Sequence, residues 1–544
     1  MDSVEVVLAM LLAVVASAYL VRAVSFPLPL PLMQIALGAL IAALSDHAVT
    51  LDPAVFFLLF LPPLLFLDGW RMPNDRLLRD KAAILELALG LVVFTVIGAG
   101  FLIHWLIPTM PLAVAFALAA IVSPTDPVAV SSITSRVPMP KRLMHILQGE
   151  ALLNDATGLV CFRFAVAAAL TGGFSLLSAS LTFLWMAVAG LGLGVGVTLA
   201  VTAAQRALSE RIGEESGSPI LISLLIPFGA YLLAERVHAS GILAAVAAGI
   251  TMSRVELGGR ALAATRVERA AVWDAVQFAL NGIMFVLLGE QLPAILRGAV
   301  ASVAQSGHQS PWWLAVYALA INLALALLRF IWVWASLRLT LFKVQQRGGH
   351  LTGPHWRVVL AVSLSGVRGA ITLAGVMTLP LLMPDGTAFP ERELAVFLAT
   401  AVILLSLLMA SIGLPAILRG LELPQESAER KEEGMARHDA AAAAIVAIEK
   451  AERELPPQSP DADIRTQAAA RVIALYQRRL DGGASTGRQA ARLRRVDQVE
   501  REMRMAGMHA EREEIFSLAR QSKISDETSR KLVREIDLVD ARYR

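Results

Sequence analysis

The stretch IVSPTDPVAV at residues 121–130 interrupts an apolar segment, residues 111–135, that is long enough to cross a lipid bilayer. Pro127 directly follows Asp126 and removes a helical hydrogen bond, so we expect the helix to break there and leave backbone carbonyls unpaired. An ionisable side chain in the hydrocarbon core costs about 3 kcal/mol or more and is typical of an ion or proton pathway. A carboxylate beside a broken helix at membrane depth therefore predicts a cation site.

A second stretch, GEALLNDATG at residues 149–158, places Asp155 near the middle of the apolar segment 143–170. We therefore expect Asp155 and Asp126 to meet near the membrane midplane. Asn154 precedes Asp155 and is rotated from it by about 100° around a helix, so both side chains can flank one cavity.

Asp155 is the better proton carrier, because burial favours its protonated form and a nearby cation favours its charged form. One carboxylate would then hold either a proton or a metal ion. The alternative is a packing carboxylate bonded to Arg368 or Asn154. Thr125 offers a hydroxyl and a carbonyl oxygen to a hard cation. For Asp126 three roles stay open: direct binding, binding through water, and neutralisation of Arg368.

Glu150 and Arg329 lie at similar depths in the apolar segments 143–170 and 311–338. A buried ion pair is the simplest reason for two charges there, because removing either partner would leave the other uncompensated at a cost of about 3–5 kcal/mol. We interpret the pair as structural, and ion binding at this position is the alternative.

A second interrupted segment, 356–380, contains SLSGVRGAITLAG at residues 363–375, with three glycines. Arg368 lies at its centre. We interpret it as a fixed countercharge for the ends of the two broken helices, and a direct part in the chemistry of the ion site is the alternative.

Four further polar side chains lie in the apolar segments. We interpret Asp68 as a solvated carboxylate at a helix end, and Gln277 and Asn281 as interhelical hydrogen-bonding residues. Arg163 lies outward of Asp155 and either lines an outer exit or pairs with that carboxylate.

Composition indicates a polytopic all-α membrane protein. The 544 residues are 56% hydrophobic and 17% charged, and the mean hydropathy is +0.62, well above soluble domains. Apolar runs fill residues 1–420, and residues 421–544 are rich in charge, so we expect a membrane domain followed by a helical cytosolic tail. The sequence pI of about 9.1 reflects basic loops, and no nucleic-acid partner is expected. Cys161 is the only cysteine, which excludes disulfides within the chain and cysteine metal sites; no cofactor is expected.

Thirteen apolar segments are candidate membrane spans. They cover residues 4–24, 26–44, 51–69, 82–106, 111–135, 143–170, 175–204, 218–235, 238–253, 268–292, 311–338, 356–380 and 392–418. The first six and the last six would form inverted repeats, with the two interrupted segments at corresponding positions.

The Lys and Arg residues of the loops give an orientation. One alternate set of loops holds eighteen of them, and the other holds three, Arg236, Arg297 and Arg392. Because basic loops stay in the cytosol, we expect the N-terminus outside and the C-terminus in the cytosol.

Four stretches together resemble the monovalent cation:proton antiporter family 1, which includes prokaryotic NhaP-type exchangers and animal Na⁺/H⁺ exchangers. They are FFLLFLPPLLFLDG (56–69), SPTDPVAV (123–130), GEALLNDATGLV (149–160) and SGVRGAITLAG (365–375). Their order and spacing agree as well. The likeness covers most of residues 1–420 and does not extend into the tail.

The resemblance implies inverted repeats over the thirteen segments with two crossed broken helices. It also implies a homodimer and alternating access, in which a core subdomain moves against a dimerisation subdomain. The family's structural ion pair corresponds to Glu150 and Arg329, and its broken-helix arginine corresponds to Arg368. Competition between proton and cation falls on Asp155. The cation and proton site as a whole corresponds to Thr125, Asp126, Asn154 and Asp155.

The implied activity is exchange of cytosolic Na⁺ or Li⁺ for external H⁺ across the cell membrane. Asn154-Asp155 in place of two aspartates is similar to the electroneutral branch, which implies one Na⁺ for one H⁺. Many relatives carry Ser where this chain has Ala151, one helical turn before Asp155. A hydroxyl ligand is therefore missing, so selectivity among Na⁺, Li⁺ and K⁺ stays open, and K⁺/H⁺ exchange is the alternative.

Two other classes of function fit parts of the sequence. A gated cation channel with the tail as its gate would use the same carboxylates, although a carboxylate shared by two ions favours exchange. A membrane-anchored sensor would report ion levels to the tail. We expect the tail to pack on itself, dock on the cytosolic loops, contact anionic lipid or bind a regulator, and a solvated helical domain without a ligand is the simplest interpretation.

Overall fold

The structure is a computed structural model of residues 1–544, and the part that it describes is predominantly α-helical. The described residues are 2–23, 29–44, 53–73, 80–134, 139, 141–173, 176–212, 217–257, 263–305, 312–346, 356–419, 427–453, 462–484, 488–521 and 523–540.

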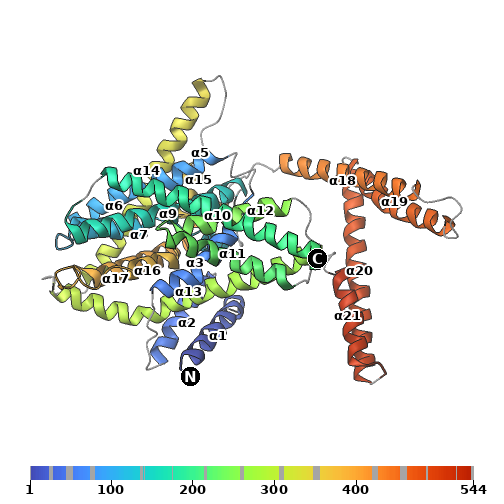
Figure 1. The fold of residues 1–544 in the computed structure, drawn as a ribbon, viewed down its shortest axis with the longest axis horizontal. Coiled ribbons are helices and arrows are strands. Elements are labelled where there is room, and N and C mark those ends of the chain that lie inside the picture. Colours follow the sequence, from blue (N-terminus) through green and yellow to red (C-terminus); the bar gives the residue numbers. More distant parts are fainter. Residues whose placement is uncertain are drawn as a thin grey trace. The chain divides into compact units, whose positions relative to one another are not determined.

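The chain divides into two compact units, Met1–Glu422 and Leu423–Arg544, close to the change from apolar to charged sequence. The helices are drawn in Figure 1. Those of the first unit are α1 (Asp2–Ala23), α2 (Leu30–Leu44), α3 (Pro53–Arg71), α5 (Lys81–Leu85), η1 (Glu86–Leu91), α6 (Val92–Leu106), α7 (Leu112–Val122), α8 (Pro127–Thr134), α9 (Lys141–Thr171), α10 (Leu176–Ile212), α11 (Gly217–Arg236), α12 (Gly241–Leu257), α13 (Ala263–Gln305), α14 (Trp312–Gln346), α15 (Trp356–Leu364), α16 (Ala370–Met377) and α17 (Arg392–Leu418).

Each of the thirteen predicted segments overlaps one helix or a run of short ones. By length and composition alone, seven helices within the described ranges can cross a membrane. Shorter apolar helices cover Val7–Ala23, Leu30–Leu44 and Leu112–Val122. The first unit thus has the composition and helix lengths of a multi-pass membrane protein.

Both predicted interruptions are present. α7 ends at Val122 and α8 begins at Pro127, and α15 ends at Leu364 and α16 begins at Ala370. Proline is favourable at the first position of a helix, where its missing N–H would have no partner in any case. Pro127 therefore begins the second half-helix, five residues after the first one ends at Val122.

The structure contains a π-helical turn that the sequence did not predict. Glu86–Leu91 form η1, which lies between α5 and α6 within one long helical run. Gly90 of this turn lies against the indole of Trp332 on α14, where an added Cβ would be 2.6 Å from the ring. A π-helical turn contains one extra residue compared with an α-helical turn. Here the extra residue accompanies packing against another helix, and the local sequence gives no signal for it.

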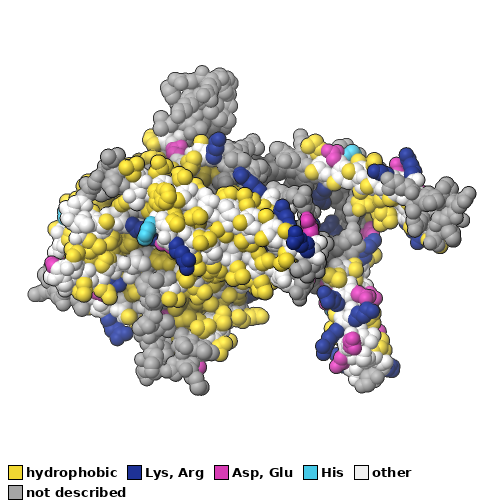
Figure 2. Space-filling model, viewed as in Figure 1, with side chains coloured by type: hydrophobic (Ala, Val, Ile, Leu, Met, Phe, Trp, Pro, Cys, Tyr) yellow, Lys and Arg dark blue, Asp and Glu magenta, His cyan; other side chains and the backbone are white. Residues whose placement is uncertain are grey.

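Apolar side chains cover the outward faces of the long helices. On α6 and α14 the exposed large apolar residues recur mostly every fourth position and so form a stripe on each helix. The stripes consist of Val93, Ile97, Phe101 and Trp105 on α6, and of Leu319, Leu323, Leu327 and Ile331 on α14, which also exposes Trp312, Trp313 and Trp334. Figure 2 shows apolar side chains spread over this unit, whereas the second unit displays more charge. Such stripes suit a hydrocarbon environment.

Three pairs of helices approach so closely that their backbones touch at glycines. Between α2 and α13, a Cβ on Gly289 would lie 2.0 Å from the carbonyl oxygen of Ile35. Between α3 and α12, a Cβ on Gly249 would lie 2.0 Å from the carbonyl oxygen of Phe66. Gly194 of α10 meets the backbone of α12 in the same way. Small residues permit such contacts between helices in membranes.

The second unit consists of α18 (Ser427–Arg453), α19 (Ala462–Ala484), α20 (Arg488–Arg520) and α21 (Asp526–Asp540). Arg512 of α20 forms ion pairs with Asp537 at 2.8 Å and with Asp540 at 3.0 Å on α21. Ile515 and Ile536 are buried in the same unit. These contacts join α20 to α21, and the partners of the tail stay a prediction.

Candidate cation site

The two broken helices contact each other at their breaks. The backbone N–H of Asp126 donates to the carbonyl oxygen of Val367 at 2.7 Å. Gly369 lies against the carboxylate, since an added Cβ would be 2.0 Å from Asp126 Oδ2. A Cβ on Gly158 of α9 would lie 2.3 Å from the ring of Pro124. Two glycines therefore allow α9 and both breaks to meet.

Arg368 is buried and binds carbonyl oxygens of both breaks. Its Nε donates to the oxygen of Val122 at 2.9 Å, and its Nη1 donates to the oxygen of Gly366. Its backbone N–H donates to Ser406 Oγ of α17 at 3.1 Å. Carbonyls at the C-terminal end of a helix carry partial negative charge. Arg368 therefore lies where a countercharge for these ends would be needed.

Glu150 and Arg329 form a bidentate ion pair between α9 and α14. The two N–O distances are 2.5 and 2.7 Å, and the side chains are 1% and 3% exposed. Arg329 Nε also donates to the carbonyl oxygen of Val362 at 3.0 Å. The two charges neutralise each other in a region that is closed to solvent.

A chain of hydrogen bonds leads from this pair to the first break. Thr125 Oγ1 donates to Glu150 Oε1 at 3.2 Å. Asn154 Nδ2 donates to Thr125 Oγ1 at 3.0 Å and to its carbonyl oxygen at 3.4 Å. Asn154 Oδ1 is buried and accepts no hydrogen bond within the described part of the chain. The amide of Asn154 therefore fixes the backbone and hydroxyl of Thr125.

A cavity of about 30 Å³ lies beside the first break, with room for roughly two water-sized spheres. Three of the four predicted site residues, Thr125, Asp126 and Asp155, line it. Asn154 is not part of the lining, because its rotation around α9 directs its amide to Thr125. The full set of polar side chains around the cavity is Asp68, Thr125, Asp126, Asp155, Gln277, Asn281 and Thr372.

Asp155 also lines a second, smaller cavity of about 10 Å³ on the side of Phe57 and Leu159. Among the residues that the structure describes, no side chain forms a hydrogen bond or an ion pair with Asp155. The interpretation as a packing carboxylate bonded to Arg368 or Asn154 therefore finds no support in the contacts. Asp155 lies between two small spaces, with carboxylate and hydroxyl oxygens beside it on one side.

The transmembrane sodium/hydrogen exchanger family matches residues 9–420, which contain both broken helices and the cavity. The chain belongs to this family. The family consists of cation/proton antiporters, which are membrane transporters and not enzymes, and this exchanger is a multi-pass membrane protein.

Several named proteins are similar along most of the exchanger. YjcE of Escherichia coli, named an uncharacterized Na⁺/H⁺ exchanger, is 42% identical over 98% of both chains. The sodium, potassium, lithium and rubidium/H⁺ antiporter of Bacillus subtilis is 38% identical over 100% of this chain and 78% of its own. The protein of the same name from Bacillus pumilus is 43% identical over 75% of this chain and 60% of its own.

The sodium proton antiporter MjNhaP1 from Methanocaldococcus jannaschii, solved at pH 8, has a similar structure. The TM-score is 0.58 at 16% sequence identity, covering 77% of this chain and 99% of that one. At this identity the likeness concerns the fold alone.

The structure places three further polar side chains of the exchanger at the cavity. Asp68 is half-buried and lines the cavity, so its interpretation as a solvated helix-end carboxylate was wrong. α3 ends only at Arg71, one turn beyond it, and so carries Asp68 alongside the break. Gln277 and Asn281 line the cavity as well, and Gln277 also forms the predicted interhelical hydrogen bond, since its Oε1 accepts from Arg71 of α3 at 2.7 Å. The sequence signal that could have indicated a place for Asp68 at the cavity was its position at the end of the FLPPLLFLDG motif.

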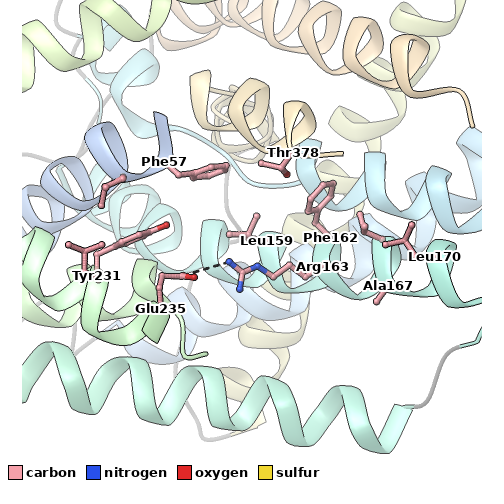
Figure 3. A pocket seen from close by; sticks show the side chains of 12 residues that line it. Phe57, Leu159, Phe162, Arg163, Ala167, Leu170, Tyr231, Glu235 and Thr378 are labelled. Atoms are coloured by element: carbon pink, nitrogen blue, oxygen red, sulfur yellow. Dashed lines mark ion pairs between the residues drawn. The ribbon is translucent and has the colours of Figure 1, made fainter. Parts of the chain in front are cut away.

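Arg163 pairs with Glu235 of α11 at 3.6 Å and not with Asp155. Both side chains lie at a larger pocket of about 630 Å³, and Figure 3 shows them extending toward each other beside Tyr231 and Leu159. The alternative of a pair with Asp155 is therefore wrong, and a role of Arg163 at an outer exit stays a prediction.

Replacing Gly369 with Ala should impair transport more than folding. The new Cβ would lie 2.0 Å from Asp126 Oδ2, so the carboxylate must move away from its present place beside the cavity. We expect cation-dependent proton flux in proteoliposomes to fall by about tenfold or more, as a misplacement of about 1 Å can produce. Gly196→Ala on α10, where an added Cβ meets nothing within 4 Å, is the control. Equal activity of the two variants would contradict the assignment of Asp126 to the site.

Proposed function

We propose that this exchanger carries out secondary active exchange of Na⁺ or Li⁺ for H⁺, with proton and cation competing for Asp155. The observation that supports this most directly is the placement of Asp155 between two small cavities, without a described bonding partner. A carboxylate that is already bonded to an arginine could not release and rebind ions as readily. Thr125 and Asp126 supply hydroxyl, carboxylate and carbonyl oxygens, which a hard cation prefers.

In this proposal the remaining site residues position the ligands. Asn154 and Glu150 hold the hydroxyl of Thr125 from two sides, with Arg329 compensating the charge of Glu150. Arg368 offsets the negative ends of α7 and α15. The transported ions are the substrates, and no resident cofactor enters the proposal.

We further propose that the thirteen segments each cross the membrane as inverted repeats, with the N-terminus outside and the tail in the cytosol. The eighteen-to-three division of basic loop residues supports this orientation. The glycine-contacting helices α2, α3, α10, α12 and α13 would belong to a fixed dimerisation subdomain of a homodimer. The broken helices and α9 would belong to the core subdomain that moves against it.

K⁺ is a second candidate substrate. Ala151 lines the cavity at the position where a hydroxyl is missing, so one ligand for a small cation is absent and space is added. Two relatives carry potassium and rubidium in their names. Both observations favour a broader range of cations than Na⁺ and Li⁺ alone.

Purified exchanger in proteoliposomes with an imposed pH gradient tests the proposal. Addition of Na⁺ or Li⁺ should dissipate the gradient, and a panel that includes K⁺ and Rb⁺ ranks the substrates. If no alkali cation dissipates the gradient, antiport is excluded. Current that flows without any proton gradient would instead favour the channel.

The exchange should be electroneutral, with one monovalent cation for one proton. A single carboxylate that holds either ion moves no net charge per cycle, so the rate should not depend on an imposed membrane potential. Movement of one net charge would instead change the driving force by about 2.3 kcal/mol per 100 mV. The potential is best set with a permeant anion, so that no second cation competes. A rate that follows the potential would contradict this stoichiometry.

A further inference from the structure

A polar path leads from the cavity along one face of α13 and to the C-terminal end of α3. On α13, Asp274, Gln277 and Asn281 are spaced three and four residues apart and share one face. Gln277 and Asn281 line the cavity, whereas the side chain of Asp274 is 66% exposed. On α3, Asp68 lines the same cavity and Arg71 follows it by three residues on the same face.

Arg71 binds two members of this path at once. Its Nη1 donates to Gln277 Oε1 at 2.7 Å, and its Nη2 forms an ion pair with Asp274 Oδ1. Arginine has only donors, so the atom of Gln277 that faces it must be the amide oxygen. The NH₂ group of Gln277 is then the part of the amide that Arg71 does not bind, and an NH₂ group is no ligand for a cation. The amide oxygen, which is a good ligand, is withheld.

We propose that Arg71 sets the cation affinity of the cavity as approached along this path, and that Asp274 controls Arg71. Arg71 acts by holding the oxygen of Gln277 and by placing a positive charge one helical turn from Asp68. Asp274 holds the guanidinium at the exposed end of the path and so limits its approach to Asp68. Arg71 is thus a positioning residue for the exchange, and the inference rests on the proposed function.

The two partners should have opposite effects, which an ion pair with a purely structural role would not produce. Arg71→Gln removes the positive charge and frees the oxygen of Gln277, so the KM for Na⁺ should fall by about three- to tenfold. Asp274→Asn frees the guanidinium to approach Asp68, so the KM should rise by about three- to tenfold. The maximal rate should stay within about twofold in both variants, because neither group lies at Asp155. The assay is Na⁺-dependent proton flux of the full-length protein in vesicles of both orientations, and only the face with Arg71 should respond.

A double-mutant cycle distinguishes control of Arg71 by Asp274 from a simple effect of surface charge. If Asp274 acts through Arg71, Asp274→Asn should have little effect in the Arg71→Gln background, whereas independent surface charges would add. Glu268→Gln, an exposed carboxylate of the same helix, measures the surface-charge effect alone. That effect should fade at high ionic strength, whereas the effects of Arg71 and Asp274 should persist in part.

Three results would overturn the proposal: KM changes of the same sign for the two single variants, additive changes in the cycle, or an unchanged KM in both. Arg71→Lys gives a second, milder variant, because a single ammonium cannot hold both partners as a guanidinium does. Its KM should lie between those of the unaltered exchanger and Arg71→Gln. If the unaltered exchanger shows no cation-dependent flux, the proposed function itself has failed, and that outcome is distinct from these three.

Discussion

Asp155→Asn should abolish exchange and leave the fold intact. Asparagine has nearly the same shape, so the packing around the two cavities is preserved, but it neither ionises nor carries a proton. Loss of a charged ligand costs about 2–3 kcal/mol of cation stabilisation, or roughly 100-fold in affinity, and the coupling to protons is lost altogether. In proteoliposomes we therefore expect Na⁺-dependent proton flux to fall to the level of empty vesicles.

Asp385→Asn provides the matched control for this variant. Asp385 lies in an exposed loop, where its Oδ1 accepts hydrogen bonds from the backbone and hydroxyl of Thr387 at 3.0 and 2.6 Å. Its removal should change the flux by less than about twofold, as for other surface substitutions. Substantial flux through Asp155→Asn would reject Asp155 as the carrier. Asp126 and Asp68, the other carboxylates of the cavity, would then be the residues to replace.

The largest effect on stability is expected from Arg329→Met. This change leaves Glu150 charged, 1% exposed and without its bidentate partner, at a cost of about 3–5 kcal/mol. The hydrogen bond of Thr125 to Glu150 would not compensate, because it is a single bond at 3.2 Å. Thermal unfolding of the purified protein in detergent should therefore begin at a much lower temperature than for the unaltered exchanger.

The double variant Glu150→Gln with Arg329→Met should be more stable than Arg329→Met alone, because no unpaired charge stays buried. Arg453→Gln is the control, since it removes an ion pair with Glu449 whose side chains are 81% and 45% exposed. Such a pair contributes less than about 1 kcal/mol. If Arg329→Met unfolds together with the control, Glu150 is not paired as the structure has it.

The interruptions of both broken helices could be predicted because their causes are local. Pro124 and Pro127 both lie in the first break, where each removes a backbone N–H, and glycines flank Arg368 on both sides within three residues. The meeting of Glu150 with Arg329 could be predicted from depth alone, because a bilayer gives each charge in a span a coordinate along its normal. Depth does not give the angle around the helix, however. For this reason the sequence predicted Asn154 at the cavity, whereas its amide points to Thr125 and does not line the cavity.

Features that depend on distant packing could not be predicted. Arg71 and Gln277 are separated by 206 residues in the chain, and nothing near either position indicates the other. The π-helical turn lacks a local signal for the same reason, since its Gly90 lies against a side chain of α14. Asp68 was misinterpreted because its environment depends on how far α3 extends past the first break.

The contacts of Gly289 and Gly249 have a mechanical consequence. Where two backbones touch, no change of side-chain rotamer can accommodate a displacement of one helix against the other. The joined helices must therefore move together as one rigid body. α9 is held mainly by side chains: Ile84 lies against Gly149 and the ring of Pro124 against Gly158, where the carbonyl oxygen of Ala120 would also be 2.9 Å from an added Cβ. We therefore expect elastic strain during turnover to concentrate around α9. Hydrogen exchange of the backbone amides should be slowest where the rigidly joined helices meet, at Gly289 and Gly249.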